Sequence, residues 1–213
     1  MASVGRSRRE GTSRGFDRLI FFTDAVTAIA ITLLILPLID LVPEYAAKAG
    51  SSPTGFLQGH FAQLWSFVLS FVIIARLWLA NHSTLERVER ATPGLMIIDL
   101  AWAFTVVVLP LPSAITAVFP TDRVSVAFYI GTMTASSLLL TALAWIVDRQ
   151  PELGTTDRDD ARLALWGVGS ISAMFVLALV VGVLVPGINY LSLLLLLLAF
   201  PLDAVVKSRL RRG

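Results

Sequence analysis

The sequence contains no cysteine, and this absence excludes several kinds of site at once. A chain without cysteine has no disulfide framework, no thiolate nucleophile and no cysteine-based metal site. Histidine is almost as scarce, since His60 and His82 are the only two in 213 residues. Two imidazoles are too few for a multi-histidine metal centre within one chain. We therefore expect neither a bound metal nor a cofactor.

Charged side chains are also few, at 15% of the residues, whereas 56% of the residues are hydrophobic. Soluble domains average roughly 25% charged residues, and a soluble fold of this size could not hide so much apolar surface. The composition therefore predicts that lipid surrounds most of the chain. The sequence pI of about 9.4 does not indicate a nucleic-acid partner, because the basic residues lie at the ends of apolar stretches.

Six apolar stretches are long enough to cross a bilayer core, which requires about 20 helical residues. This pattern predicts an all-α, polytopic membrane protein with six transmembrane helices. We expect the spans near residues 19–41, 61–81, 95–119, 124–147, 163–185 and 188–206. They form one transmembrane domain over residues 18–206, between a disordered basic arm at 1–17 and a basic tail at 207–213. Small residues at 131–137 and 167–173 predict close helix contacts.

Lysine and arginine are distributed unequally between the two sides of these spans. Most of them lie in the N-terminal arm, in the second and fourth connections and at the C-terminus. The opposite side carries Lys48 and Arg123, and Arg76 lies inside the second span. Positive residues mark the cytoplasm, so we expect both termini to be cytoplasmic in a multi-pass protein of the plasma membrane. The sequence contains no nucleotide-binding loop and no catalytic domain, so we do not expect an enzyme.

The first predicted helix has two different faces when it is projected at about 100° per residue. Asp24 lies on one face, and a carboxylate inside a span rarely faces lipid. It must therefore turn toward neighbouring helices and find hydrogen-bond donors. Asp24 is either a structural carboxylate or a group that handles ions or protons. The other face carries Phe22, Ala25, Ile29, Leu33 and Leu36, with Thr32 at its edge.

Arg18, Phe22, Thr23 and Asp24 form a pattern that resembles the Arg-x-x-x-Phe-Ser-Asp signature of the transmembrane protein 175 channels. Thr23 replaces the serine and keeps the hydroxyl. The following Ala-Ile-Ala-Ile-Thr-Leu-Leu-Ile-Leu run resembles the continuation of that family's first helix. At the end of the second span, Trp78 and His82 resemble the family's Trp-x-x-x-His pattern. The last three predicted spans match no motif.

The resemblance implies a potassium-selective channel, in which four copies of the chain place their first helices around a pore. It implies that Ile29, Leu33 and Leu36 form the gate and that Thr32 supplies a threonine layer for potassium selectivity. Aliphatic side chains converging on an axis close a pore by dewetting, and hydroxyls can replace part of a cation's hydration shell. Without the resemblance, Ile29, Leu33 and Leu36 would be interpreted as ordinary packing or lipid-facing residues. Potassium is then the permeant ion, and the chain's partner is itself.

The predicted topology places the aspartate of the first span at the same depth in the membrane as several residues of the next two spans. We expect a hydrogen-bonded cluster that joins the three helices near the inner leaflet and satisfies two carboxylates. Asp99 stands where the family has asparagine. We expect Arg76 to pair with Asp24 or Asp99, or to extend toward lipid phosphates. The predicted cluster contains Arg18, Phe22, Thr23, Asp24, Trp78, Asn81, His82 and Asp99.

Other functions remain open at this stage. A secondary transporter or a proton-conducting membrane protein is the main alternative, and a membrane enzyme is a third. Against a transporter, we find no inverted repeat and no span broken mid-membrane, because Pro37, Pro110, Pro112 and Pro201 lie near predicted helix ends. Asp40 and Glu44 follow the first span. They form either an acidic ring at the outer mouth of a pore or part of a solvated loop.

Overall fold

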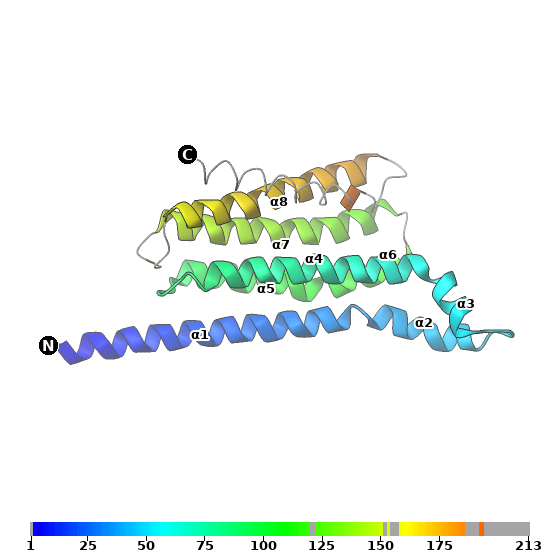
Figure 1. Cartoon of the computed structure of the whole chain (residues 1–213), viewed down its shortest axis with the longest axis horizontal. Helices are drawn as coiled ribbons and strands as arrows, with labels where there is room; N and C mark the ends of the chain where they lie inside the picture. The colour runs from blue at the N-terminus through cyan, green and yellow to red at the C-terminus, as the bar shows by residue number, and fades with distance from the viewer. Residues whose placement is uncertain (1, 120–121, 151–152, 154–157, 186–191, 194–213) are drawn as a thin grey trace.

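The computed structural model describes residues 2–119, 122–150, 153, 158–185 and 192–193. Within these residues the regular elements are long helices that lie nearly parallel or antiparallel (Figure 1). Their order is α1 (Ala2–Leu33), α2 (Leu36–Ala46), α3 (Pro53–Gly59), α4 (Phe61–Leu85), α5 (Pro93–Val108), α6 (Pro110–Val118), α7 (Arg123–Arg149) and α8 (Arg158–Leu184).

Among the described residues, five helical stretches are long and apolar enough to cross a membrane, and they correspond to the first five predicted spans. The sixth predicted span, 188–206, falls outside the described residues except for 192–193, and the tail at 207–213 also falls outside them. A sixth span therefore stays a prediction. The five stretches are Gly15–Ala46, Phe61–Leu85, Pro93–Thr116, Arg123–Arg149 and Asp160–Leu184.

Two of these stretches are broken, although the sequence predicted continuous helices. α1 ends at Leu33 and α2 begins at Leu36, because Pro37 has no amide hydrogen to offer the carbonyl of Leu33. The third stretch breaks at Leu109, between α5 and α6, next to Pro110. The prediction that the spans are unbroken is wrong at both places, and proline is the physical reason.

The N-terminal arm also differs from the prediction. Residues 2–17 were expected to be disordered, but they form the first half of α1. Extending an existing helix adds one hydrogen bond for each residue that is ordered, whereas starting a new helix is costly. The apolar span that begins near Leu19 therefore provides the nucleus from which the polar arm continues as helix.

The helices form three layers, with α7 and α8 at one side, α4, α5 and α6 in the middle, and α1 with α2 at the other side (Figure 1). α7 packs against α8, α5, α4 and α6, whereas α1 packs against α4, α5 and α6. The interior is filled by large side chains such as Trp102, Ile130 and Phe175, which are almost completely buried. α1 is therefore an edge helix of the single chain, with one face packed and one face open.

Side-chain caps fix where several helices begin. Ser52 accepts a hydrogen bond from the Gly55 amide at the start of α3, and Asp122 accepts from the amides of Val124 and Ser125 at the start of α7. A cap of this kind satisfies amide groups that the helix itself leaves unpaired. The starts of α3 and α7 lie at the same end of the bundle, opposite the start of α1 (Figure 1).

Candidate functional site

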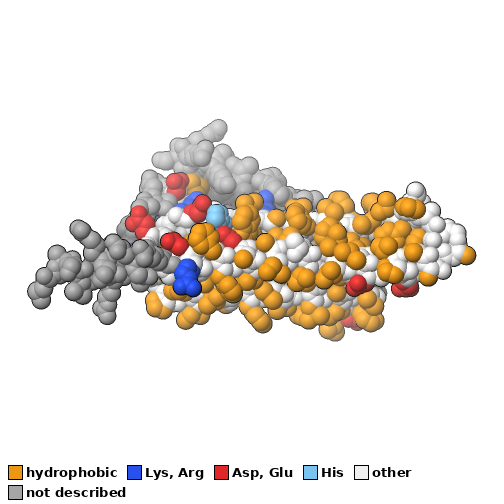
Figure 2. All heavy atoms as spheres, turned by 90° about the horizontal axis from the view of Figure 1, so that it is seen from below, with side chains coloured by type: hydrophobic (Ala, Val, Ile, Leu, Met, Phe, Trp, Pro, Cys, Tyr) orange, Lys and Arg blue, Asp and Glu red, His pale blue; other side chains and the backbone are white. Residues whose placement is uncertain are grey.

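The exposed face of α1 carries the predicted pore stripe. Side chains spaced three or four residues apart, from Leu19 through Thr27 to Leu34, are buried against the neighbouring helices. On the opposite face the exposed fraction is 60% for Ile29, 41% for Leu33 and 45% for Leu36. Figure 2 looks onto this side of the molecule and shows hydrophobic side chains along most of its length. An apolar helix face that is open in one chain is available to lipid or to other copies of the chain.

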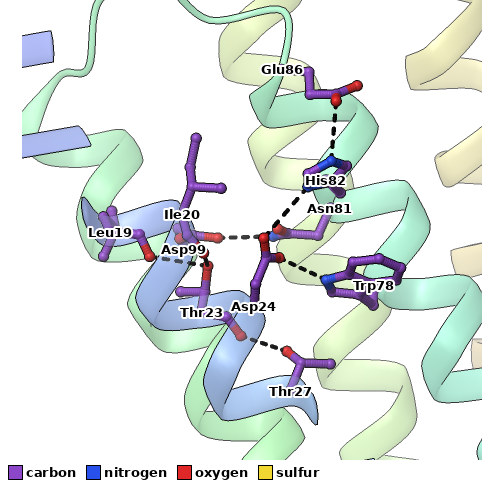
Figure 3. Close-up of polar contacts among 10 residues, drawn as sticks. All are labelled: Leu19, Ile20, Thr23, Asp24, Thr27, Trp78, Asn81, His82, Glu86 and Asp99. Atoms are coloured by element: carbon purple, nitrogen blue, oxygen red, sulfur yellow. Dashed lines mark hydrogen bonds and ion pairs between the residues drawn. The ribbon is translucent and has the colours of Figure 1, made fainter. Parts of the chain in front are cut away.

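Asp24 lies on a different face and turns toward α4, as Figure 3 shows. The indole Nε1 of Trp78 donates a hydrogen bond to Asp24 Oδ1 at 2.7 Å. His82 Nδ1 lies 3.7 Å from Asp24 Oδ2, within the range of an ion pair but too far for a hydrogen bond. The Trp78 and His82 rings stack with their centroids 5.5 Å apart. One carboxylate thus connects α1 to two consecutive inward-facing turns of α4.

His82 has a second acidic neighbour that the sequence analysis missed. Its Nε2 lies 3.0 Å from Glu86 Oε1, one turn further along α4. The i to i+4 spacing of His82 and Glu86 was the signal that could have revealed this contact. The imidazole therefore lies between the carboxylates of Asp24 and Glu86, at the end of the bundle that holds the start of α1 (Figures 1 and 3).

A second contact joins α4 to α5 next to the first one. Asn81 Nδ2 donates to Asp99 Oδ1 at 2.8 Å, and both side chains are buried. The other carboxylate oxygen, Asp99 Oδ2, is buried without a hydrogen-bond partner among the residues that the structure describes. Asp24 and Asp99 are each held by α4, through Trp78 and Asn81, so α4 joins α1 to α5 at this depth.

The other three members of the predicted cluster lie next to Asp99, in the case of Thr23, or at the surface. The Thr23 hydroxyl is buried but donates to carbonyls of its own helix, at 3.0 Å to Ile20 and 3.2 Å to Leu19. Arg18 and Phe22 are exposed, and no ion pair among the described residues joins Arg18 to Asp24, Glu86 or Asp99. Arg76 lies half-buried in α4, and its predicted pairing with Asp24 or Asp99 stays a prediction.

The predicted pore residues occupy two helices instead of one. Ile29, Thr32 and Leu33 lie on α1, whereas Leu36 is the first residue of α2 beyond the break. The Thr32 hydroxyl is exposed and donates to the Ile29 carbonyl at 2.7 Å, which leaves its oxygen lone pairs directed outward. Asp40 and Glu44 are exposed one turn apart on α2, so of the two alternatives the solvated loop does not apply, and the acidic ring stays a prediction.

The described residues contain no group of three or more His, Asp or Glu side chains arranged to hold a metal ion. The donors at Trp78 and Asn81 are each used by a carboxylate. The chemistry of this site is therefore that of a polar joint between three helices. It places the open face of α1 relative to the rest of the chain.

Comparison with known proteins identifies the family of the chain. The family model described as "Endosomal/lysosomal potassium channel TMEM175" matches residues 18–110, which include Asp24, Trp78, His82 and Asp99. A potassium channel of Streptomyces collinus is 33% identical over 144 residues, which cover 64% of this chain and 66% of that protein. This chain belongs to the TMEM175 family.

Two further relatives are named for different permeant ions. A potassium channel of Chamaesiphon minutus is 27% identical over 129 residues, covering 59% of this chain and 63% of that protein. The endosomal/lysosomal proton channel TMEM175 of Danio rerio is 23% identical over 141 residues, covering 65% of this chain and 26% of that protein. The matched segments thus span about two thirds or less of these relatives, and the activity of this TMEM175 chain is a proposal.

The fold of the TMEM175 family extends over nearly the whole chain. The crystal structure of a lysosomal potassium-selective channel TMEM175 homolog from Chamaesiphon minutus superposes with a TM-score of 0.63 and 21% sequence identity. The alignment covers 93% of this chain and 97% of that structure. The shared fold therefore includes α7 and α8, for which the sequence offered no motif.

Proposed function

We propose that this protein is a potassium-selective channel that conducts passively, with α1 lining a pore on the axis of a homotetramer. The observation that carries the proposal is the open apolar face of α1, which a single chain leaves uncovered while the opposite face is packed and joined by Asp24. The chain belongs to a family in which two bacterial relatives are named potassium channels. A chain with one such helix must oligomerise before this helix can enclose a path.

In the proposed pore, Ile29 forms the narrowest layer, and Leu33 and Leu36 form the next layers in the direction of α2. Four copies of these side chains around an axis would exclude water and close the path. Thr32 lies at the edge of the same face, and its hydroxyl oxygen keeps acceptor lone pairs while its proton bonds to Ile29. Four such oxygens offer a cation part of the coordination that it loses with its water. Selectivity for potassium is proposed to arise at this layer.

The test is the current across a planar bilayer under a potassium/sodium gradient, for the wild type, Ile29→Asn and Thr32→Ala. Ile29→Asn should wet the constriction and raise the conductance severalfold. Thr32→Ala should move the potassium-to-sodium permeability ratio toward one. Ile97→Asn is the matched control, because Ile97 on α5 is 65% exposed and undergoes the same chemical change. The pore assignment is wrong if Ile29→Asn behaves like Ile97→Asn.

The absence of cysteine permits a second test of the same geometry. Ile29→Cys introduces the only thiol in the chain, and a water-soluble charged thiol reagent should then block the current. Ile97→Cys treated with the same reagent should conduct as before. If the reagent blocked Ile97→Cys and not Ile29→Cys, the water-filled path would not run along α1.

Proton conduction is a second candidate, because the Danio rerio relative is named a proton channel and the network of this chain holds an imidazole between two carboxylates. The first and third spans are broken helices, so a coupled transporter is a third candidate, because transporters form their binding sites from discontinuous helices. Liposome flux separates the three functions. A channel passes potassium without a second gradient, a proton channel dissipates a pH gradient in the absence of potassium, and a transporter requires the second ion.

A further inference from the structure

α7 and α8 carry two arginine–tryptophan pairs that the proposed channel does not use. Trp145 and Arg149 end α7, and Arg162 and Trp166 lie in the first turns of α8. The Arg149 guanidinium carbon lies 5.3 Å from the centre of the Trp145 ring, in the geometry of a cation–π contact. In each helix the two members are four residues apart, so they lie on one side of that helix.

The two pairs lie at the same depth. Ser137 Oγ and Ser172 Oγ are 2.6 Å apart, and this contact fixes the register of the antiparallel helices α7 and α8. Arg149 lies 12 residues beyond Ser137, about 18 Å along the helix, and Arg162 lies 10 residues before Ser172, about 15 Å along the helix. The two arginines are therefore nearly level, at the end of the bundle that holds the start of α1.

The two arginines also project from the same side of the helix pair. The face of α7 that meets α8 is identified by Ser137 and Thr141, and the face of α8 that meets α7 is identified by Ser172. At about 100° per residue, Arg149 and Arg162 both stand roughly a quarter turn from these faces. Because the helices are antiparallel, the two rotations lead to one common side of the pair.

This side of the helix pair is open, and among the residues that the structure describes no acidic side chain neutralises its positive charge. Both arginine side chains are exposed, and among the described residues neither guanidinium makes an ion pair or a hydrogen bond. Asp160 is two residues from Arg162 and therefore projects to the opposite side of α8, where its carbonyl accepts from Arg87. Asp148 is half-buried toward α8.

The tryptophans show what surrounds the arginines. Trp145 is 50% exposed and Trp166 is 62% exposed, each one turn closer to the middle of its span than its arginine. Exposed indoles at this level are typical of the boundary between acyl chains and headgroups. A guanidinium just beyond them stands at the level of lipid phosphates, which it can bind with two parallel hydrogen bonds.

We propose that Arg149 and Arg162, flanked by Trp145 and Trp166, form a binding site for the phosphate of an anionic phospholipid between the ends of α7 and α8. Two guanidinium groups on adjacent helices can bind one phosphate together, and the indoles contact the upper acyl chains. The charge selects an anionic lipid over a zwitterionic one, because no described acidic side chain projects to this side of the pair. The site lies in the layer farthest from α1, so it binds lipid at the periphery whatever passes along α1.

The test uses brominated lipids, which quench nearby tryptophan fluorescence, in vesicles of phosphatidylcholine containing brominated phosphatidylglycerol or, separately, brominated phosphatidylcholine. In the wild-type protein, brominated phosphatidylglycerol should quench the tryptophan fluorescence more strongly than the same content of brominated phosphatidylcholine. Arg149→Ala/Arg162→Ala should abolish this difference, with the relative affinity falling about fivefold for each guanidinium removed. Lys48→Ala/Arg123→Ala removes the same charge from exposed positions at the other end of the bundle and should keep the difference.

Three further arms make the result decisive. Trp145→Phe/Trp166→Phe should remove the phosphatidylglycerol-specific part of the quenching, because these indoles lie beside the proposed phosphate. Added inorganic phosphate should not remove the difference, and if it does, the site takes free phosphate and the proposal is wrong. The size of the purified oligomer should be the same for Arg149→Ala/Arg162→Ala and the wild type. Dissociation of the oligomer would show that this side is an interface between copies, which would overturn the lipid site.

Discussion

Trp78 donates its indole hydrogen to the carboxylate of Asp24 at 2.7 Å, and this hydrogen bond joins the edge helix α1 to α4. The rest of the buried face of α1 is apolar except for Thr23 and Thr27, whose hydroxyls donate to carbonyls of α1 itself. A hydrogen bond fixes rotation about the helix axis, which apolar packing alone specifies weakly. The direction in which Ile29 and Leu33 point is therefore set one to three turns away, by Asp24.

We expect Trp78→Phe and Asp24→Leu each to lower the free energy of unfolding by about 0.5–2 kcal/mol, the range measured for hydrogen bonds between membrane helices. The double variant should be less destabilised than the two single changes together, because both remove the same bond. Unfolding of the purified protein in detergent measures all three variants. Trp65→Phe, at an exposed indole of α4, is the control. Strict additivity would show that the two groups do not interact.

Asp24→Ala provides a separate prediction about what this joint does. We expect it to reduce the yield of the assembled protein, because α1 loses its fixed orientation, while the assembled fraction keeps the wild-type ratio of potassium to sodium permeability. Size-exclusion profiles and bilayer currents on the same preparation measure the two effects. An Asp24→Ala protein of normal yield and stability but with altered selectivity would instead make Asp24 an ion-handling group.

Asn81 and Asp99 form the most buried polar pair of this region. Asn81→Leu leaves the Asp99 carboxylate without its donor, and we expect a loss of about 3 kcal/mol, since a buried unsatisfied charged group is costly. Asn81→Leu/Asp99→Leu should recover most of this loss, because two apolar groups then meet. Thermal unfolding in detergent compares the variants. A double variant less stable than Asn81→Leu would contradict the pairing.

The sequence predicted the joint better than it predicted the shape of the helices. Asp24 could be assigned to a helix interface because a carboxylate in a span requires donors, and the depths of Trp78 and Asn81 made them candidates. The partner of the Thr23 hydroxyl could not be predicted, because a helical threonine can bond to its own carbonyls as well as to a neighbour. Pro37 was visible, but whether it bends a span or ends a helix depends on the packing beyond it.

The hydroxyls of Ser137, Thr141 and Ser172 form a polar seam between α7 and α8, and the sequence predicted this seam only in part. The small residues near Ser137 and Ser172 predicted close packing, and the structure confirms that these helices contact each other extensively. The partners within the seam depend on register, which small residues leave undetermined. The hydroxyl of Ser172 lies 2.6 Å from Ser137 Oγ and 2.7 Å from Thr141 Oγ1.

Ser172→Ala should therefore destabilise the protein by about 1–2 kcal/mol, because two hydroxyls of α7 lose a partner inside the bundle. Thr132→Ala is the matched control, since the Thr132 hydroxyl donates to the Phe128 carbonyl within α7 itself, and we expect a smaller change. Thermal unfolding measures both variants. Equal effects at the two positions would show that the seam contributes no more than a hydroxyl bonded within its own helix.

Gly55 and Tyr45 give the sharpest prediction at the other end of the molecule, where α3 turns back onto α2. A Cβ added to Gly55 would overlap the hydroxyl of Tyr45, whose ring is held edge-on against Phe56 with centroids 5.4 Å apart. Gly55→Ala should therefore lower the stability by about 1 kcal/mol, because the ring must move. Tyr45→Phe removes the overlapping atom, so Tyr45→Phe/Gly55→Ala should be more stable than Gly55→Ala alone.

Gly59→Ala in the same helix adds a methyl group into open space and should be neutral or slightly stabilising. Thermal unfolding of these variants decides the matter, and a Gly55→Ala protein as stable as Gly59→Ala would show that Tyr45 does not occupy the position described.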